Sequence, residues 1–435
     1  MTDGVSDGAD EPTTYAAAVG SVDKSEESEL DTPEEASEDV PAEALEEAAP
    51  ARRRASPWLI AGRVLVGLVS VVALAAMSIV WLRIDQLDSS KNTTDALAEA
   101  QELPGAPSTD DGANDILIVG NDSRTDMQGK RLSAEMLRKL RTEATDTLNT
   151  DTLILLRIPR DGSQGSAISI PRDTYVTVPN LGREEKINGA YGITKEQVAQ
   201  DLRNAGEKDR EKIERESDDA GRSSLIQAVQ GLTGVRVDHY IEVSLYGFYL
   251  LTEAIDGVDV CLNRSTSDPD SGASFRAGPQ TVRGGDAVAF VRQRKNLPRG
   301  DLDRIVRQQT FLASAMNKLL GSDLLTNGAK LNALEDAVSK SVVMDDGLHF
   351  LELINQAQAL ASGQMQFVTI PVTGVGARND RQQSIITVDV PAVQAYVQSL
   401  VSGTPAPAPP PVGNLGGNRL LDLSGAQPPA VPCVD

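Results

Sequence analysis

An uncharged apolar run from Val64 to Leu82 is the feature that most constrains what this chain can fold into. The run is nineteen residues long, and about 20 apolar residues span the hydrocarbon core of a bilayer as a helix. Trp58 and Trp81 stand near its two ends, where aromatic side chains anchor membrane helices at the interface. The sequence therefore predicts one transmembrane helix over residues 58–82.

Basic residues predict which way this helix crosses the membrane. Four arginines precede the run: Arg52, Arg53, Arg54 and Arg63. The positive-inside rule therefore places residues 1–57 in the cytoplasm and the chain beyond the run outside. A cleavable signal peptide is the alternative. The leader of about fifty residues, the length of the run and the lack of a clear A-x-A site after it favour an uncleaved anchor in the cell membrane.

The acidity of the chain is concentrated in its first segment. The formal net charge is −22, and residues 1–50 hold sixteen Asp or Glu against a single Lys. Tyr15 is the only aromatic residue there, which leaves too little apolar surface to offset the entropy of ordering the chain. We predict a disordered acidic cytoplasmic tail over residues 1–57.

The part beyond the membrane divides into three segments. Residues 83–108 are polar and are predicted to form a stalk, residues 109–402 have the size of one globular domain, and residues 403–435 form a Pro-rich tail. The only cysteines, Cys261 and Cys433, both fall on the outer side, where disulfides persist. A disulfide joining the tail to the domain is favoured, and two free thiols are the alternative.

Short β-branched runs alternate with helical patterns in this domain. The segments "DILIVG", "TLILLRI" and "AISIP" are typical of buried strands, and "RVDHYIEV" and "VDVCL" of further strands. Helical patterns occur in "SSLIQAVQGLTG", "SLYGFYLLTEAI", "DLDRIVRQQTFLASAMNKLL" and "VPAVQAYVQSL". Residues 200–222 are almost entirely polar, and we predict an exposed helix or loop there. The mixture indicates the α/β class, as an α/β or α-β-α domain with a central sheet.

Several common catalytic signatures are missing from the sequence. It contains no G-x-x-x-x-G-K-[ST] and no H-E-x-x-H, and its G-x-S-x-G match, GVSDG at residues 4–8, lies in the acidic first segment. Asp and Arg instead occur at the ends of the predicted strands, where ligand crevices form in open α/β sheets. Two carboxylates that meet there would suit Mg²⁺. The residues concerned are Asp122, Arg124, Asp151, Arg172 and Asp173.

A basic cluster lies in "VRQRKNLPRGDLDRIVRQQ", residues 291–309. Several arginines that converge beside a carboxylate pair suit a pyrophosphate, because a guanidinium can bind phosphate oxygens bidentately. A solvated surface with local ion pairs is the alternative, and nucleic acid is disfavoured because few aromatic residues interleave. The side chains expected to converge are Arg292, Arg294, Arg304, Arg307 and Gln308.

The order of motifs resembles that of the LytR-CpsA-Psr family of cell-wall glycopolymer ligases. Its motifs correspond, in order, to "DILIVGNDSR", "NTDT", "SIPRDT", "KINGAY", "DHYIEV", "GVDVCL", "AFVRQR" and "GDLDRIVRQQ", over roughly residues 113–320. The long spacer between the first two motifs and the two cysteines resemble the actinobacterial branch. One departure is Asn149, because the family often has Arg two residues before the Asp of the second motif.

The resemblance implies a fold and a reaction. The fold is an α-β-α sandwich with a central mixed sheet and a hydrophobic pocket for a polyprenyl chain. The reaction moves a glycan from a polyprenyl-pyrophosphate carrier to peptidoglycan as a phosphodiester. The glycan would be arabinogalactan if the source is a mycolic-acid-bearing actinobacterium, and teichoic acid, teichuronic acid or capsule otherwise. A lipid-carrier pyrophosphatase and a non-catalytic protein that binds polyprenyl lipid or wall glycan are the alternatives.

The resemblance also implies residue roles. Asp122 and Asp151 match Mg²⁺ ligands, with Mn²⁺ as an alternative ion, and Arg172 matches the essential pyrophosphate arginine. Asp173 and Asp301 match carboxylates that orient arginines or help deprotonate the incoming hydroxyl; which of them is the base stays open. Further phosphate or network contacts are implied for Lys186, Arg292, Arg294, Arg304 and Gln308.

Overall fold

The structure is a computed structural model of the 435-residue chain. It describes residues 92–103, 105–108, 111–125, 130–143, 148–298, 300–321, 327–349, 365–402 and 432–435, with five single positions between 70 and 82. The predicted acidic tail and all but these five positions of the predicted transmembrane helix lie outside the described residues, as do residues 403–431. Within the described ranges, no helix is both long and apolar enough to span a bilayer.

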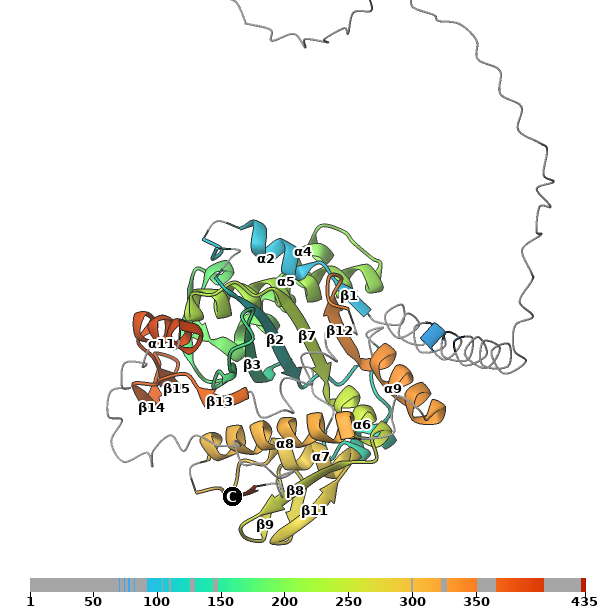
Figure 1. The fold of residues 1–435 in the computed structure, drawn as a ribbon. Helices are drawn as coiled ribbons and strands as arrows, with labels where there is room; N and C mark the ends of the chain where they lie inside the picture. Colours follow the sequence, from blue (N-terminus) through green and yellow to red (C-terminus); the bar gives the residue numbers. More distant parts are fainter. Residues whose placement is uncertain are drawn as a thin grey trace, which may run out of the picture. The chain divides into compact units, whose positions relative to one another are not determined.

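A seven-stranded mixed sheet forms the centre of the domain (Figure 1). The β1–β12, β7–β2 and β4–β13 pairs are parallel, and the β12–β7, β2–β3 and β3–β4 pairs are antiparallel. The predicted α/β domain with a central mixed sheet is therefore confirmed. In spatial order the strands are β1 (Asn92–Thr94), β12 (Val342–Asp345), β7 (His239–Ser244), β2 (Ala113–Asn121), β3 (Thr150–Pro159), β4 (Gly165–Ser169) and β13 (Met365–Thr369).

One face of the sheet is covered by four helices. Alternate residues of β2, such as Leu117 and Val119, point to this face and are completely buried. Burying one such Leu or Val side chain contributes about 1.5–3 kcal/mol. The helices are α2 (Ala96–Glu102), α4 (Ile187–Asn204), α5 (Arg210–Thr233) and α11 (Val390–Ser402).

Helices α4 and α5 cross closely because of a glycine. A Cβ atom at Gly221 would lie 2.6 Å from the Tyr191 ring, which is closer than real contacts allow. The predicted polar segment 200–222 thus includes the first half of α5, which begins after the N-cap Asp209. The side chain of Asp209 accepts hydrogen bonds from the backbone N–H groups of Glu211 and Lys212.

The opposite face of the sheet is covered by α8 (Asp301–Gly321), and α6 (Leu245–Ala254) and α9 (Gly328–Ser341) pack beside it (Figure 1). Ile116 of β2 and Leu156 of β3 lie in this second core with Leu312 of α8. Helices on both faces make three layers. In the described part of the chain, the remaining helices are α3 (Ala134–Lys139), α7 (Gly284–Arg292) and the short 3₁₀ helix η1 (Pro179–Leu181).

Smaller sheets surround these layers. In the three-stranded sheet, β8 lies between β11, which is antiparallel to it, and β16, which is parallel to it. The other small sheets are the pairs β5–β6, β9–β10 and β14–β15. Their bounds are β5 (Tyr175–Val178), β6 (Arg183–Lys186), β8 (Val258–Leu262), β9 (Thr266–Asp268), β10 (Ala273–Phe275), β11 (Gly278–Val282), β14 (Gly374–Arg378), β15 (Ser384–Thr387) and β16 (Cys433–Val434).

The ends of the domain differ from the predicted boundaries at 109 and 402. Strand β1 pairs with β12 in the central sheet, and Ala96 and Leu97 are buried in the main core. Residues 92–103, predicted as part of a stalk, therefore belong to the domain, because this short apolar stretch covers the sheet. At the other end, Cys433 forms a disulfide with Cys261 and β16 extends the small sheet.

Candidate active site

The antiparallel pairing of β2 and β3 brings two of the predicted carboxylates to one edge of the sheet. The two strands are antiparallel, and Asn121 at the end of β2 is paired with Thr150 at the start of β3. Asp122 therefore directly follows β2, and Asp151 is the second residue of β3. The backbone N–H of Asp122 donates to the Asn149 carbonyl at 3.0 Å, and the Asn149 N–H donates to Asp122 Oδ1 at 2.8 Å.

Two arginines pair with these carboxylates, and a third, Arg292, lies within range of their charges. Arg124 Nη1 lies 3.3 Å from Asp122 Oδ2, and Arg172 forms an ion pair with Asp151. Arg292 is the last residue of α7. Burial and the neighbouring Arg124 lower the pKa of Arg292, while Asp151 and Asp122 oppose this shift. Five of the predicted residues, from separate parts of the chain, thus share one polar site.

The pair Asp122 and Asp151 fits the modest needs of Mg²⁺. Mg²⁺ is usually bound by one or two carboxylates together with water and phosphate oxygens. Burial raises the pKa of Asp122 above its ordinary value and the charge of Asp151 adds to the rise, although the Asn149 N–H opposes it. A cation would relieve this repulsion. The described residues contain no group of three or more His, Cys, Asp or Glu side chains placed to hold a metal ion.

Asp173 and Lys186 form a neighbouring ion pair. Lys186 Nζ lies 2.9 Å from Asp173 Oδ1, and both side chains are largely buried. Lys186 is the N-cap residue of α4, and the backbone carbonyl of Asp173 accepts a hydrogen bond from Ile386 at 2.8 Å. Asp173 is therefore held from two sides, directly after Arg172.

The basic cluster 291–309 is divided by the fold. Arg307 is completely buried, and it donates from Nε to the Asp435 carbonyl at 2.5 Å and from Nη1 to Gln293 Oε1 at 2.7 Å. Its guanidinium also lies over the Phe290 ring, 5.1 Å from the centroid. Burial lowers the pKa of Arg307 to about 10, although Asp303 and Asp435 oppose this. Arg307 thus binds Asp435 and Gln293 rather than the carboxylate pair of the site.

The other predicted residues of this cluster have varied surroundings. Gln308 donates to the Val291 carbonyl at 3.2 Å, so its amide ties α8 to the end of α7. Arg294 is exposed, and its backbone N–H donates to Asp268 Oδ2 at 3.0 Å. Arg304 is buried on α8. Asp301 begins α8, and its side chain lies outside the described part of the chain.

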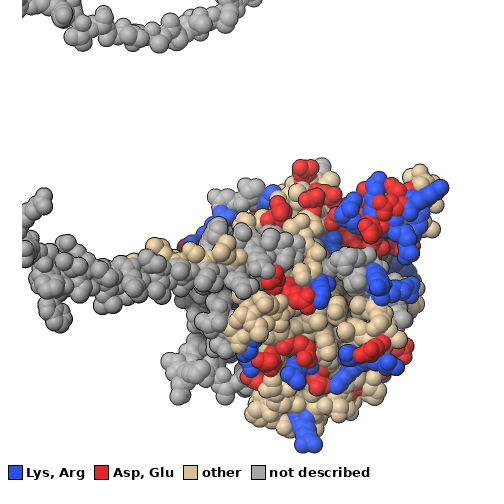
Figure 2. Space-filling view, turned by 90° about the vertical axis from the view of Figure 1, so that its right-hand side faces the viewer, with Lys and Arg blue, Asp and Glu red and all other residues tan. Residues whose placement is uncertain are grey.

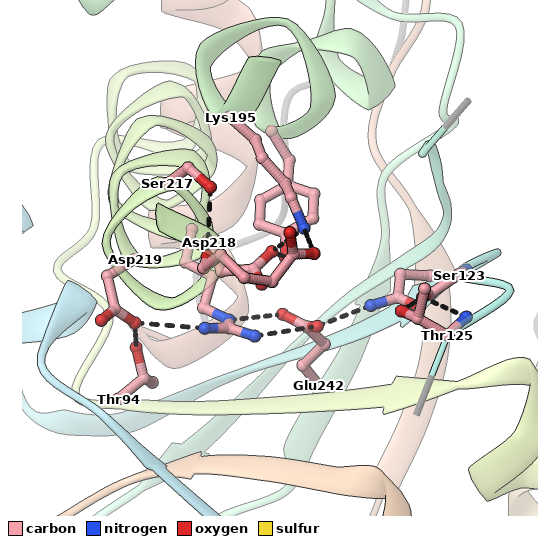
Figure 3. A network of polar contacts seen from close by, with 12 residues as sticks. Thr94, Ser123, Thr125, Lys195, Ser217, Asp218, Asp219 and Glu242 are labelled. Carbon is pink, nitrogen blue, oxygen red and sulfur yellow. Dashed lines mark hydrogen bonds and ion pairs between the residues drawn. The ribbon is translucent and has the colours of Figure 1, made fainter. Parts of the chain in front are cut away.

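A buried network behind the site was not predicted from the sequence (Figure 3). Glu242 of β7 is only 2% exposed and accepts hydrogen bonds from Asn121 Nδ2 at 2.5 Å and Arg222 Nε at 2.9 Å. Tyr240 donates its hydroxyl to the same carboxylate at 2.8 Å. Asn121 Oδ1 in turn accepts from the Ser123 N–H at 3.0 Å. Glu242 therefore supports the turn that carries Asp122 and Arg124.

The same network reaches other elements. Arg222 Nη1 lies 3.1 Å from Asp219 Oδ1, which also accepts from the Thr94 hydroxyl of β1. Next to it, Lys195 of α4 lies between Glu214 and Asp218, at 2.5 and 2.7 Å (Figure 3). One available signal was the alternation in "DHYIEV", which places a glutamate on the same face as a buried tyrosine.

Comparison with known proteins identifies the family once this geometry is established. The sequence profile of the LytR_cpsA_psr family matches residues 80–399, so the chain belongs to this family. The family resemblance of the motifs is thereby confirmed. Cell wall biosynthesis protein LcpA of Corynebacterium glutamicum is 46% identical over 347 residues, which cover 80% of this chain and 66% of that protein.

Other matches are more distant. The polyisoprenyl-teichoic acid–peptidoglycan teichoic acid transferase TagU of Bacillus mycoides is 26% identical over 53% of this chain and 60% of that protein. The chain thus spans about two thirds or less of these relatives' lengths. Among solved structures, B. subtilis TagV has a TM-score of 0.46 at 20% identity over 68% of this chain and 99% of that chain. A LytR-Csp2A-Psr enzyme from Actinomyces oris has a TM-score of 0.47 at 14% identity over 68% and 92%.

Proposed function

We propose that this protein is a membrane-anchored phosphotransferase that attaches a cell-wall glycopolymer to peptidoglycan. The donor is the glycan on a polyprenyl-pyrophosphate carrier, and the product is a phosphodiester. The proposal is carried by the carboxylates and arginines that lie together at one end of the antiparallel strands β2 and β3. They are Asp122, Asp151, Arg124, Arg172 and Arg292. Two carboxylates among three arginines suit the charge of a pyrophosphate bound with a divalent cation.

The family relatives support the same substrate class. TagU is named as a transferase with a polyisoprenyl-linked donor and a peptidoglycan acceptor, and LcpA is named for cell wall biosynthesis. For this chain we propose arabinogalactan as the transferred glycan if its source bears mycolic acids. The predicted transmembrane helix would hold the domain beside a lipid-linked donor and raise the effective concentration of that donor.

In the proposed reaction, a hydroxyl oxygen of the acceptor forms a bond to the phosphorus nearer the glycan. The bond from this phosphorus to the bridging oxygen breaks, and polyprenyl phosphate leaves. Arg172, Arg124 and Arg292 bind the phosphate oxygens, where negative charge increases in the transition state. Asp173, held by Lys186, and Asp301 are the two carboxylates proposed to orient arginines or to take the proton of the hydroxyl. Mg²⁺ held by Asp122 and Asp151 would supply additional charge neutralisation.

The test uses the purified full-length chain in detergent with a glycan-bearing polyprenyl pyrophosphate, a peptidoglycan acceptor and Mg²⁺. Polyprenyl phosphate release and glycan transfer are measured for the wild type, Asp122→Asn and Arg172→Ala. We expect both variants to lose transfer by about 10²- to 10³-fold. Arg172→Ala removes a positive charge from the phosphate site, and Asp122→Asn weakens the carboxylate pair proposed to hold Mg²⁺. Arg276→Glu, an exposed change on another part of the surface, is the matched control.

The products separate this proposal from its alternatives. Release of polyprenyl phosphate with no glycan attached to the acceptor would indicate a lipid-carrier pyrophosphatase. If the wild type binds the lipid but releases nothing with Mg²⁺ or Mn²⁺, the phosphotransferase proposal is wrong and a non-catalytic binding protein takes its place.

A further inference from the structure

A large groove leads from the candidate active site along helix α4. Its volume is about 1470 Å³, and Arg124, Asn149 and Lys186 line it next to the site. Gln200 and Arg203 line it near the other end of α4. Helix α4 has 18 residues, which corresponds to about 27 Å at 1.5 Å per residue. The groove therefore has the length of an extended polymer rather than of a single small molecule.

One stripe of α4 faces this groove. Asn188, Gly192, Glu196 and Gln200 all line it, and residues four apart lie on the same side of a helix. Leu148 and Asn149, just before β3, line it as well. A Cβ atom at Gly192 would collide with the Leu148 carbonyl oxygen. The glycine thus lets α4 lie directly against the segment that carries Asp151.

The wall formed by α4 is held against α5 by ion pairs, two of whose members, Lys195 and Glu214, also line the groove. Lys195 lies between Glu214 and Asp218 of α5, and the Tyr191 hydroxyl donates to Asp218 at 2.5 Å. Burial alone would lower the pKa of Lys195, but the two carboxylates raise it above its ordinary value. The ion pairs therefore keep this lysine charged and α4 fixed against α5. A fixed wall loses little conformational entropy when a polymer binds.

The chemistry of the lining suits a carbohydrate polymer that carries charged peptides. Asn188, Gln197 and Gln200 contribute amides, which both donate and accept hydrogen bonds, as sugar hydroxyls and N-acetyl groups also do. Exposed side chains of both signs lie among them: the cations Arg203 and Arg210 and the anions Glu196 and Glu211. On the face drawn in Figure 2, Lys and Arg are likewise intermixed with Asp and Glu. Leu132, Leu137, Leu148 and Ile193 add apolar surface to the lining. The charged side chains among them can pair with the amino and carboxylate groups of a peptide, which a hydrocarbon chain lacks.

We propose that this groove binds the acceptor, a glycan strand bearing peptides with free amino and carboxylate groups. The strand would lie along α4, so that one of its hydroxyl groups reaches the phosphate held by Arg124 and its neighbours. Arg203 and Arg210 would contact the peptide carboxylates, far from the reacting atoms. This inference rests on the proposed function, because it assigns the second substrate of that reaction to a surface.

The test measures binding and catalysis separately. The full-length chain is mixed with soluble, uncross-linked peptidoglycan strands, either with intact peptides or after an amidase has removed them. The variant Arg203→Glu/Arg210→Glu is compared with the wild type and with Arg276→Glu, which reverses an exposed charge outside the groove. Both substituted groove residues are exposed at helix ends, so thermal unfolding should be unchanged.

We expect the double variant to bind peptide-bearing strands about tenfold more weakly than the wild type. Its affinity for stripped strands and its KM for the donor should stay the same, while its KM for the acceptor rises. Equal binding of peptide-bearing strands by the double variant and the wild type would overturn the proposal, and so would a change in donor KM alone. The proposal would also be overturned if the wild type bound stripped strands as tightly as peptide-bearing strands. If the wild type binds strands as expected but never transfers glycan, the proposed function fails and the groove assignment stands.

Discussion

At the residue scale, Glu242 shows how the site depends on a side chain that does not face the substrate. Its carboxylate accepts hydrogen bonds from Asn121, Arg222 and Tyr240 in the interior of the domain. A buried carboxylate is costly unless it is paired and hydrogen-bonded. Here the pairing partner comes from α5 and the amide comes from the residue before Asp122. The charge of Glu242 is therefore coupled both to helix packing and to the turn of the site.

Replacing Glu242 with Gln keeps the size of the side chain and removes its charge. Arg222 would then keep its ion pair with Asp219 at 3.1 Å but lose the charge of Glu242, and we expect the free energy of unfolding to fall by about 3 kcal/mol. Urea unfolding measures this change. Glu216→Gln is the control, because Glu216 lies on α5, the helix of Arg222, with a side chain that is 41% exposed and its partner Lys212 at 3.9 Å. Equal stability of the two variants would contradict the anchoring role of Glu242.

At the scale of elements, the short strand β16 fixes the end of the chain to the arginine-bearing helices. It pairs with β8, and the Asn263 N–H donates to the Val434 carbonyl at 2.8 Å. Arg307 of α8 donates to the last residue, Asp435, and to Gln293, which directly follows Arg292. Two residues of strand thus support α8 and the end of α7 together.

The disulfide between Cys261 and Cys433 should stabilise this arrangement, since it joins residues 172 positions apart. We expect Cys261→Ser/Cys433→Ser to lose about 3 kcal/mol of unfolding free energy. Thermal unfolding with and without a thiol reductant measures the effect. The reductant should lower the melting temperature of the wild type and leave that of the double variant unchanged. A wild type that is insensitive although its disulfide has been reduced would show that β16 holds without the bond.

At the scale of the whole molecule, the sequence predicted elements better than their arrangement. Continuous β-branched runs indicated β2 and β3, and Asp122 and Asp151 were expected together because both lie at strand ends. The pairing of β2 with β7 was not predictable, because a long connection separates these strands. Helical periodicity showed that Arg307 lies off the apolar stripe of its helix, but it could not show that β16 covers that side.

The stability of the whole domain should also depend on pH through one carboxylate far from the candidate site in the sheet. Asp115, near the start of β2, is completely buried, and its Oδ2 lies 2.6 Å from Arg157 Nη1. Its Oδ1 has no hydrogen-bond partner among the described residues. Burial raises the pKa of Asp115 from 3.8 to about 8, although Arg157 opposes the rise. The folded state therefore keeps a proton that the unfolded state has lost.

Between about pH 4 and pH 8, the free energy of unfolding should therefore fall as the pH rises, by at most about 1.4 kcal/mol per pH unit. The contribution is complete below the unfolded pKa and is lost as the pH passes through about 8. Asp115→Asn resembles the protonated acid and cannot ionise, so its stability relative to the wild type should increase from pH 5 to pH 8. Urea unfolding at both pH values measures this, with the exposed Asp380→Asn as the control. A variant that instead loses stability at pH 8 would mean that Asp115 is ionised and that its charge pair with Arg157 stabilises the fold.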